Sequence, residues 1–170
     1  MGRCRYPRCG PFSLRRPELA DYLLDNNNDP ITGFQGWLVK VGSGLTLIPT
    51  KYIAAETYKI TPDQRMEETA ERDVTGKLHR ETVENMPVKI EFDTPPMLSN
   101  TDVAALNTIL SNAYSSAPER KLLVAYYDPE EDAYKQESCY VPNVDYPIRN
   151  IDVTGKKITY DAIRYAFIGY

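Results

Sequence analysis

The chain has 170 residues, of which 42% are hydrophobic and 26% are charged, with a formal net charge of −4 at pH 7. This size and balance are typical of one soluble globular domain that buries its own core. They argue against a membrane protein, because no apolar run approaches the roughly 18 residues that a membrane span needs.

The charge is divided unevenly along the chain. Residues 1–20 carry five Arg and one Glu, so the remaining residues hold 15 basic and 23 acidic side chains. Because a nucleic-acid partner needs a basic surface, the acidic body predicts no specific nucleic-acid binding. Two interpretations of the basic arm stay open: contact with nucleic acid, or docking onto an acidic neighbouring subunit.

The three cysteines do not form a recognisable metal motif. Cys4 and Cys9 are separated by four residues instead of the two of a zinc ribbon, and the chain has one His. A Cys4–Cys9 disulfide is one option, but we expect free thiols in a reducing cytoplasm. The N-terminus lacks the apolar stretch of a signal peptide, which predicts a product made in the cytoplasm.

The first part of the chain predicts an arm, a short helix and then strands. Residues 1–16 show no periodicity, whereas residues 17–24 have the pattern of a short helix with Pro in its first turn. We therefore expect residues 1–35 to be a basic N-terminal extension of a β domain over residues 36–170. Strands are predicted over residues 37–41, 45–48 and 52–60.

Residues 61–83 predict a long β-hairpin that turns at Thr75-Gly76, where Gly supplies positive φ at no steric cost. Both faces of this hairpin mix charged and apolar side chains, so neither face is apolar enough to pack on a core. Because a two-stranded ribbon alone in water is marginally stable, we expect it to leave the body and bind another copy of the chain.

The middle of the chain contains the clearest periodic patterns. Residues 86–92 alternate apolar and polar side chains, which predicts a strand with one buried face. Residues 99–114 have apolar side chains at helical spacing, and Ser99 with Asp102 resembles a capping box. We expect this helix to lay its apolar stripe on a sheet or to plug the end of a barrel.

The last third predicts further strands. Residues 121–127 are apolar on both faces, which indicates a central strand, and residues 133–142 return from it. A final hairpin is predicted over 146–153 and 156–168, with a β-bulge near Ala162 where the alternation changes parity. The sequence Asp-Val-Thr-Gly-Lys occurs at both 73–77 and 152–156. Repeated use of one turn is the favoured explanation; projection of both tips to the same rim of an assembly is the alternative.

The sequence offers no catalytic constellation. His79 has neither a nucleophile nor an orienting partner at a recognisable spacing. The acidic turn at 128–132 lacks the spacing and the Gly of an EF-hand loop, and Gly42-Ser43-Gly44 lacks the Lys and the helix of a phosphate-binding loop. We therefore predict no enzyme activity, no cofactor and no metal site.

Eight tyrosines gather in the C-terminal third, and they suit a core or sheet edge, a subunit interface or a carbohydrate platform. A carbohydrate- or receptor-binding module is therefore the alternative function. These tyrosines are Tyr126, Tyr127, Tyr134, Tyr140, Tyr146, Tyr160, Tyr165 and Tyr170.

The order of these patterns resembles a known group of proteins. The hairpin arm RDVTGKLHRE is followed by the strand MPVKIEF, the helix LSNTDVAALNTIL, the turn-containing LLVAYYDPEEDAYKQESCYV and the ending YAFIGY. Residues 36–170 thus resemble small structural proteins of bacteriophage tails and prophages, and more loosely the tail-tube fold of tube, distal-tail and baseplate-hub proteins. The resemblance implies a β-sandwich or barrel with one packed helix and a long protruding hairpin.

The resemblance also implies a function. A structural protein of a phage virion would assemble in the host cytoplasm into a homo-oligomeric ring, with neighbouring tail or baseplate proteins as further partners. Charged side chains across such an interface would supply register and specificity more than affinity. The residues that we expect at the subunit interface are Arg72, Asp73, Lys77, His79 and Arg80 on the hairpin, and Arg3, Arg5 and Arg8 on the arm.

Overall fold

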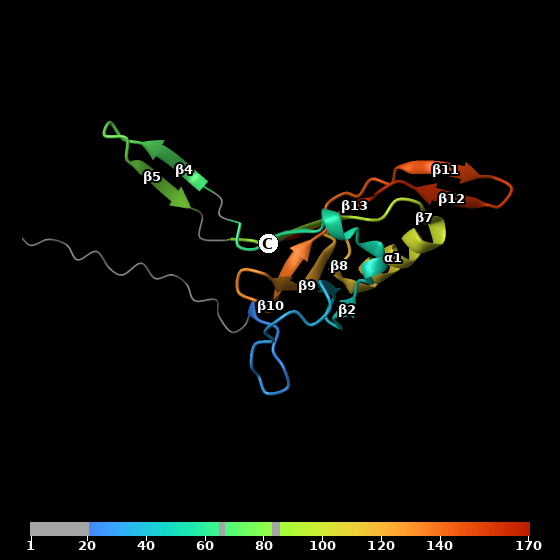
Figure 1. Ribbon diagram of the computed structural model, residues 1–170, viewed down its shortest axis with the longest axis horizontal. Helices are drawn as coiled ribbons and strands as arrows, with labels where there is room; N and C mark the ends of the chain where they lie inside the picture. The colour runs from blue at the N-terminus through green and yellow to red at the C-terminus, as the bar shows by residue number, and fades with distance from the viewer. Residues whose placement is uncertain (1–20, 65–66, 83–85) are drawn as a thin grey trace, which may run out of the picture.

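The computed structural model describes residues 21–64, 67–82 and 86–170 (Figure 1). These residues form a mainly β fold with one α-helix, which confirms the predicted fold class. The helix α1 spans Asn100–Ala113, and the 3-10 turns η2 and η3 span Thr50–Tyr52 and Ala55–Thr57. The strands are β1 (Val39–Val41), β2 (Thr46–Leu47), β3 (Lys59–Thr61), β4 (Glu67–Arg72), β5 (Leu78–Thr82), β6 (Lys89–Asp93), β7 (Leu98–Ser99), β8 (Tyr114–Ser116), β9 (Lys121–Asp128), β10 (Ala133–Tyr140), β11 (Ile148–Asp152), β12 (Lys157–Tyr160) and β13 (Arg164–Gly169).

Eight strands form one antiparallel sheet in the order β2-β1-β9-β10-β13-β6-β3, with β8 also paired to β9. Strands β2 and β3 lie at opposite ends of this order, yet only the segment with η2 and η3 separates them in the chain. That segment contacts the strand next to each end, since the Ile48 amide donates to the Val39 carbonyl of β1 and the Ala54 amide to the Asp93 carbonyl of β6. The expected sandwich or barrel is thus a curled sheet that stays open among the described strands.

The core lies between the curled sheet and α1. Val88, Ile90 and Phe92 are buried, as the alternation of residues 86–92 predicts, although Met86 is exposed. Fully burying each such side chain contributes about 1.5–3 kcal/mol. The central strand β9 buries side chains on both faces, including Leu122, Val124 and Ala125. This arrangement follows from its position between β1 and β10 in the middle of the sheet.

The helix begins where the sequence predicts. The Ser99 side chain accepts a hydrogen bond from the Asp102 amide (3.3 Å) and donates one to the Asp102 carboxylate (2.5 Å). This cap satisfies an amide that has no partner within the helix. Val103, Leu106 and Leu110 form the buried stripe of α1 and pack into the core.

The C-terminal segment differs from the predicted hairpin with a bulge. Residues 156–168 do not form one strand. The strand is interrupted at residues 161–163, where the chain passes from one sheet to the other. Before the break, β12 lies between β11 and β7 in a second sheet; after it, β13 lies between β10 and β6 in the main sheet. The change of parity near Ala162 is therefore the crossing between two sheets, each of which buries a different face of the chain.

Two further predictions are wrong in part. Residues 52–60 do not form a single strand: η2 and η3 turn the chain, and only Lys59–Thr61 pairs with β6. Residues 22–24 are not helical, because Tyr22 and Leu24 form isolated bridges with Lys135 and Pro30. Of the rest of the predicted helix, Asp21 has 3-10 geometry, and residues 17–20 lie outside the described residues.

Two ribbons extend from the body at opposite ends of its long axis (Figure 1). The first is β4–β5, within the hairpin predicted over residues 61–83. It leaves the main sheet after β3 and returns at β6, and the Gln64 amide donates to the Pro87 carbonyl at its base. The second is β11–β12, whose tip carries the other Asp-Val-Thr-Gly-Lys sequence. Within one chain the two tips therefore do not share a rim.

Candidate functional site

The tip of the β4–β5 ribbon is organised by one carboxylate. The Asp73 carboxylate accepts hydrogen bonds from the Thr75 amide (2.8 Å) and the Lys77 amide (3.0 Å), and from the Thr75 hydroxyl. Its other oxygen lies 3.1 Å from His79 Nε2. The Thr75 hydroxyl and then His79 hold the pKa of Asp73 at about 2, well below its ordinary value. Asp73 is therefore ionised at neutral pH and closes the turn.

The other predicted interface residues of this hairpin have different roles. Arg72 donates from its guanidinium to the Gly76 carbonyl (2.8 Å), so it also supports the turn. Lys77 is exposed beside it. Arg80 lies on β5, opposite Ala70 of β4. The structure thus brings Arg72, Asp73 and His79 together at one tip.

The three arginines predicted for the arm, Arg3, Arg5 and Arg8, lie outside the described residues, as do Cys4 and Cys9. The third cysteine, Cys139, is fully buried on β10, and this burial raises the pKa of its thiol. A buried neutral thiol is chemically inert.

His79, Asp73 and Thr75 lie close together but do not form a catalytic triad. In a triad the imidazole stands between the hydroxyl and the carboxylate, so that it can take the hydroxyl proton. Here the carboxylate of Asp73 stands in the middle and binds both the Thr75 hydroxyl and the His79 ring. The arrangement stabilises a turn and does not activate a nucleophile.

A charged cluster that the sequence does not predict lies near the base of the same ribbon. Lys135 on β10 is 4% exposed, and its ammonium lies 2.7 Å from the Asp128 carboxylate and 3.0 Å from that of Glu131. Asp63, just after β3, is 3.9 Å away, and Tyr22 donates to Glu131. One buried cation thereby connects the N-terminal segment, the β9–β10 turn and the start of the long hairpin.

The electrostatics of this cluster keep Lys135 charged. Burial lowers the pKa of Lys135, but the hydrogen bonds to Asp128 and Glu131 outweigh it, so the pKa lies above its ordinary value. The hydrogen bond to Glu131 also raises the pKa of Tyr22 to about 12. The only sequence signal for this site is Lys135 itself, a charged residue at a position where β10 turns a side chain inward.

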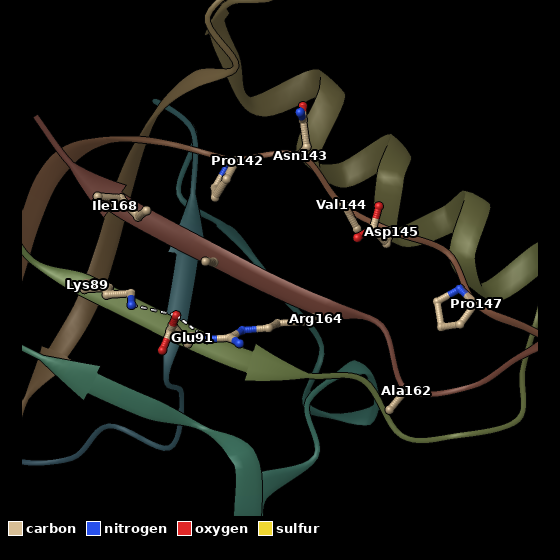
Figure 2. Close-up of a pocket in the computed structure, with 11 residues that line it drawn as sticks. Lys89, Glu91, Pro142, Asn143, Val144, Asp145, Pro147, Ala162, Arg164 and Ile168 are labelled. Carbon is tan, nitrogen blue, oxygen red and sulfur yellow. Dashed lines mark hydrogen bonds and ion pairs between the residues drawn. The ribbon is translucent and has the colours of Figure 1, made fainter.

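A groove with a volume of about 390 Å³ lies on the outer face of β6 and β13, beneath residues 142–147 (Figure 2). One Glu91 oxygen binds both Lys89 (2.8 Å) and Arg164 (2.6 Å). Lys89 and then Arg164 lower the pKa of Glu91. Val144 and Ile168 supply apolar surface beside this ion-pair cluster. The groove therefore combines charged side chains, Asp145 among them, with apolar surface.

The tyrosines of the C-terminal third do not form one exposed platform. Tyr126, Tyr134 and Tyr165 are buried in or against the core, where no glycan can reach them. Tyr146 and Tyr170 are exposed by 42% and 49%, and their aromatic neighbours are Tyr160 and Tyr140. The side chains on which the carbohydrate-binding alternative depends are therefore divided between the core and separate surface pairs.

The described residues contain neither a metal-binding cluster nor a membrane-spanning helix. No group of three or more His, Cys, Asp or Glu side chains among them is arranged to hold a metal ion. No helix in the described part of the chain is long and apolar enough to cross a membrane.

The sequence of this chain matches one family model. Residues 32–170 match the model described as a family of unknown function, DUF6711, and the chain belongs to that family. No curated protein and no solved structure matches the chain. The matched residues begin at Thr32, which bridges to Ala133 at the start of β10.

Proposed function

We propose that this member of the DUF6711 family is a structural subunit of a bacteriophage tail. In this proposal, copies of the chain assemble into a ring that serves as a tube-like, distal-tail or baseplate-hub component. The ring forms in the host cytoplasm and is built into the virion beside neighbouring tail or baseplate proteins.

The observation that carries the proposal is the β4–β5 ribbon. It forms a two-stranded sheet of its own, and residues 70–79 are exposed throughout. Val74 at its tip is fully exposed, and Leu78 is 44% exposed. An isolated ribbon of two strands gains too little burial to be stable alone in water. Contact with a second protein surface would supply the missing burial.

The order within the tip supports a role in binding. Asp73, Arg72 and His79 hold the turn in one conformation by side-chain contacts. A segment that is already ordered loses less conformational entropy when it binds, which favours affinity. Lys77 and Glu71 remain exposed beside this turn and can set the register of a partner.

The assignment to a phage tail depends on the resemblance of residues 36–170 to tail structural proteins. The mainly β architecture, the one packed helix and the protruding hairpin agree with what that resemblance implies, although the sheet is open where the resemblance implies a sandwich or barrel. The open sheet end at β3 also leaves a strand edge that a neighbouring subunit can cover.

The test is removal of the ribbon. Residues 67–82 are replaced by a short Gly-Ser linker, since the Gln64–Pro87 contact already closes the base. We expect the wild-type protein to form a ring, and the deletion protein to be a folded monomer. Native mass spectrometry and negative-stain electron microscopy measure assembly, and circular dichroism with thermal unfolding checks the fold.

A matched control shortens a different surface segment. Replacement of residues 26–28, in the loop between Leu24 and Pro30, removes exposed residues that lie away from the ribbon and should leave assembly unchanged. A deletion protein that still forms the native ring would contradict the role of the ribbon. A strictly monomeric wild-type protein with no affinity for the products of neighbouring genes would overturn the proposed function.

A further inference from the structure

The β11 strand presents an unprotected sheet edge. Among the described strands it pairs with β12 alone, and all five of its residues are exposed. Ile148 and Ile151 are 53% and 59% exposed. An exposed edge that carries aliphatic side chains is a template for pairing with another strand.

A register shift makes this ribbon amphipathic. Ile148 lies opposite Tyr160 and Ile151 opposite Ile158, with an irregularity between residues 148 and 150. Because Ile158 and Tyr160 are two residues apart, they point to the same face of β12. The shift therefore brings both isoleucines to that face as well, and β11–β12 presents one continuous apolar strip.

The two ribbons of the chain carry complementary charge. Residues 67–82 contain five acidic and three basic side chains, whereas residues 148–160 contain three basic side chains and one acidic side chain. Arg149 is paired with Asp161 (2.9 Å). Lys156 and Lys157 form no ion pair with another described residue and remain available near the tip of β11–β12.

The ribbons of one chain point away from each other along its long axis (Figure 1). They can therefore meet only between copies, as a head-to-tail contact. A contact between two different surfaces of identical chains repeats from copy to copy, and it gives a ring when the rotation closes.

We propose that the β4–β5 ribbon of one copy adds, through β4, to the free edge of β11 in a second copy. Backbone hydrogen bonds between β4 and β11 give affinity, and Leu78 on β5 adds apolar surface on the far side of β4. Attraction between the acidic ribbon and the lysines of the basic ribbon favours this head-to-tail contact over pairing of like ribbons. This inference rests on the proposed function, and it names the acceptor site for the hairpin.

The first test is disulfide trapping between two full-length variants, both with Cys4→Ser and Cys9→Ser, and with the buried Cys139 retained. One variant carries Glu71→Cys on β4 and the other carries Asn150→Cys on β11. We expect mild oxidation to yield disulfide-linked dimers from the mixture and not from either variant alone. Dimers from one variant alone would show symmetric pairing of like strands, and would overturn the inference.

The second test places a negative charge on the acceptor edge. Ile151→Glu should weaken self-association by at least about tenfold, because it replaces apolar contact with repulsion of the acidic ribbon. Leu47→Glu, at a 43% exposed position on β2, is the matched control and should leave association unchanged. Both positions are exposed, so circular dichroism should show the wild-type fold in both variants.

The outcomes separate this inference from the proposed function. Suppose that ribbon deletion abolishes the ring, but that the Glu71→Cys and Asn150→Cys variants are not trapped and Ile151→Glu has no effect. This result would support the proposed function and overturn β11 as the acceptor. A wild-type chain that does not assemble at all would overturn both. Trapping together with a selective effect of Ile151→Glu would support both.

Discussion

Lys135 illustrates how a single buried charge can hold distant segments together. Its ammonium contacts Asp128, which is fully buried, and Glu131, and it lies within 3.9 Å of Asp63. Attraction in a poorly solvated site is strong, but it must first offset the cost of removing both charges from water. The net effect of the intact pair on stability is therefore modest, whereas the effect of removing one partner is large.

Lys135→Met tests this asymmetry. The change keeps the volume of the side chain but leaves Asp128 as an uncompensated buried charge, which should cost about 3–5 kcal/mol in the free energy of unfolding. Urea denaturation followed by circular dichroism measures that loss. Lys59→Met, at an exposed position of β3, is the control and should change stability by less than about 0.5 kcal/mol. Equal effects of the two substitutions would show that the cluster has no structural role.

The ion pairs of Glu91 predict that the free energy of unfolding depends on pH. Lys89 and Arg164 lower its pKa in the folded state below the ordinary value of 4.5. The carboxylate therefore stabilises the fold above that ordinary value, and this contribution is lost as the pH falls through the lowered pKa. In Glu91→Gln the contribution is absent at every pH.

The measurement for Glu91 is the urea midpoint at pH 7 and at pH 3. Glu91→Gln should be less stable than the wild type at pH 7, and the gap should narrow at pH 3 as the wild-type carboxyl becomes protonated. Glu56→Gln, whose carboxyl forms no ion pair with a described residue, should behave as the wild type does. A gap that stays constant with pH would refute the linkage.

At the scale of elements, two copies of Asp-Val-Thr-Gly-Lys fold into different turns. In the first, Arg72 and Leu78 are the last paired residues, and Gly76 takes the positive φ of +81°. In the second, Asp152 and Lys157 are the last pair, and the positive φ of 51° falls on Lys156. The same five residues thus form the first turn without backbone strain, whereas the second turn holds a lysine in a strained left-handed conformation.

This difference predicts opposite effects of glycine and alanine. Gly76→Ala should weaken the β4–β5 ribbon by about 1–2 kcal/mol, because a left-handed conformation crowds Cβ against the backbone. Lys156→Gly should stabilise β11–β12, whereas Lys77→Gly should not stabilise β4–β5, since Lys77 has no positive φ to relieve. Amide hydrogen exchange in each ribbon measures these changes. Stabilisation by Lys77→Gly would contradict the turn assignment.

At the scale of the whole molecule, one short crossing connects the two sheets of the body. Residues 161–163 carry the chain from β12 to β13, and Thr94, 1% exposed, fastens this crossing to the end of β6. The Thr94 amide donates to the Ile163 carbonyl (2.9 Å), and the Ile163 amide donates to the Thr94 hydroxyl (3.0 Å). This pair of bonds sets where β11–β12 leaves the main sheet.

Thr94→Val tests the crossing. The substitution preserves shape but leaves the buried Ile163 amide without an acceptor, which should cost about 1–3 kcal/mol in the free energy of unfolding. Thr94→Ser keeps the hydroxyl and should recover most of the free energy of unfolding that Thr94→Val loses. Thermal unfolding of both variants, compared with the wild type, gives the measurement. A serine variant as unstable as the valine variant would show that the methyl group, and not the hydroxyl, matters.

Features that depend on near neighbours could be predicted from the residues alone. Ser99 and Asp102 cap α1, and Val88, Ile90 and Phe92 alternate into the core, because capping and periodicity act over a few residues. By contrast, the contact of Lys135 with Asp63 and the change of sheets at residues 161–163 are visible only in the folded chain. The fold also places the two ribbons at opposite ends. These features depend on pairing between residues far apart in the chain, and local pattern carries no information on which distant strands pair.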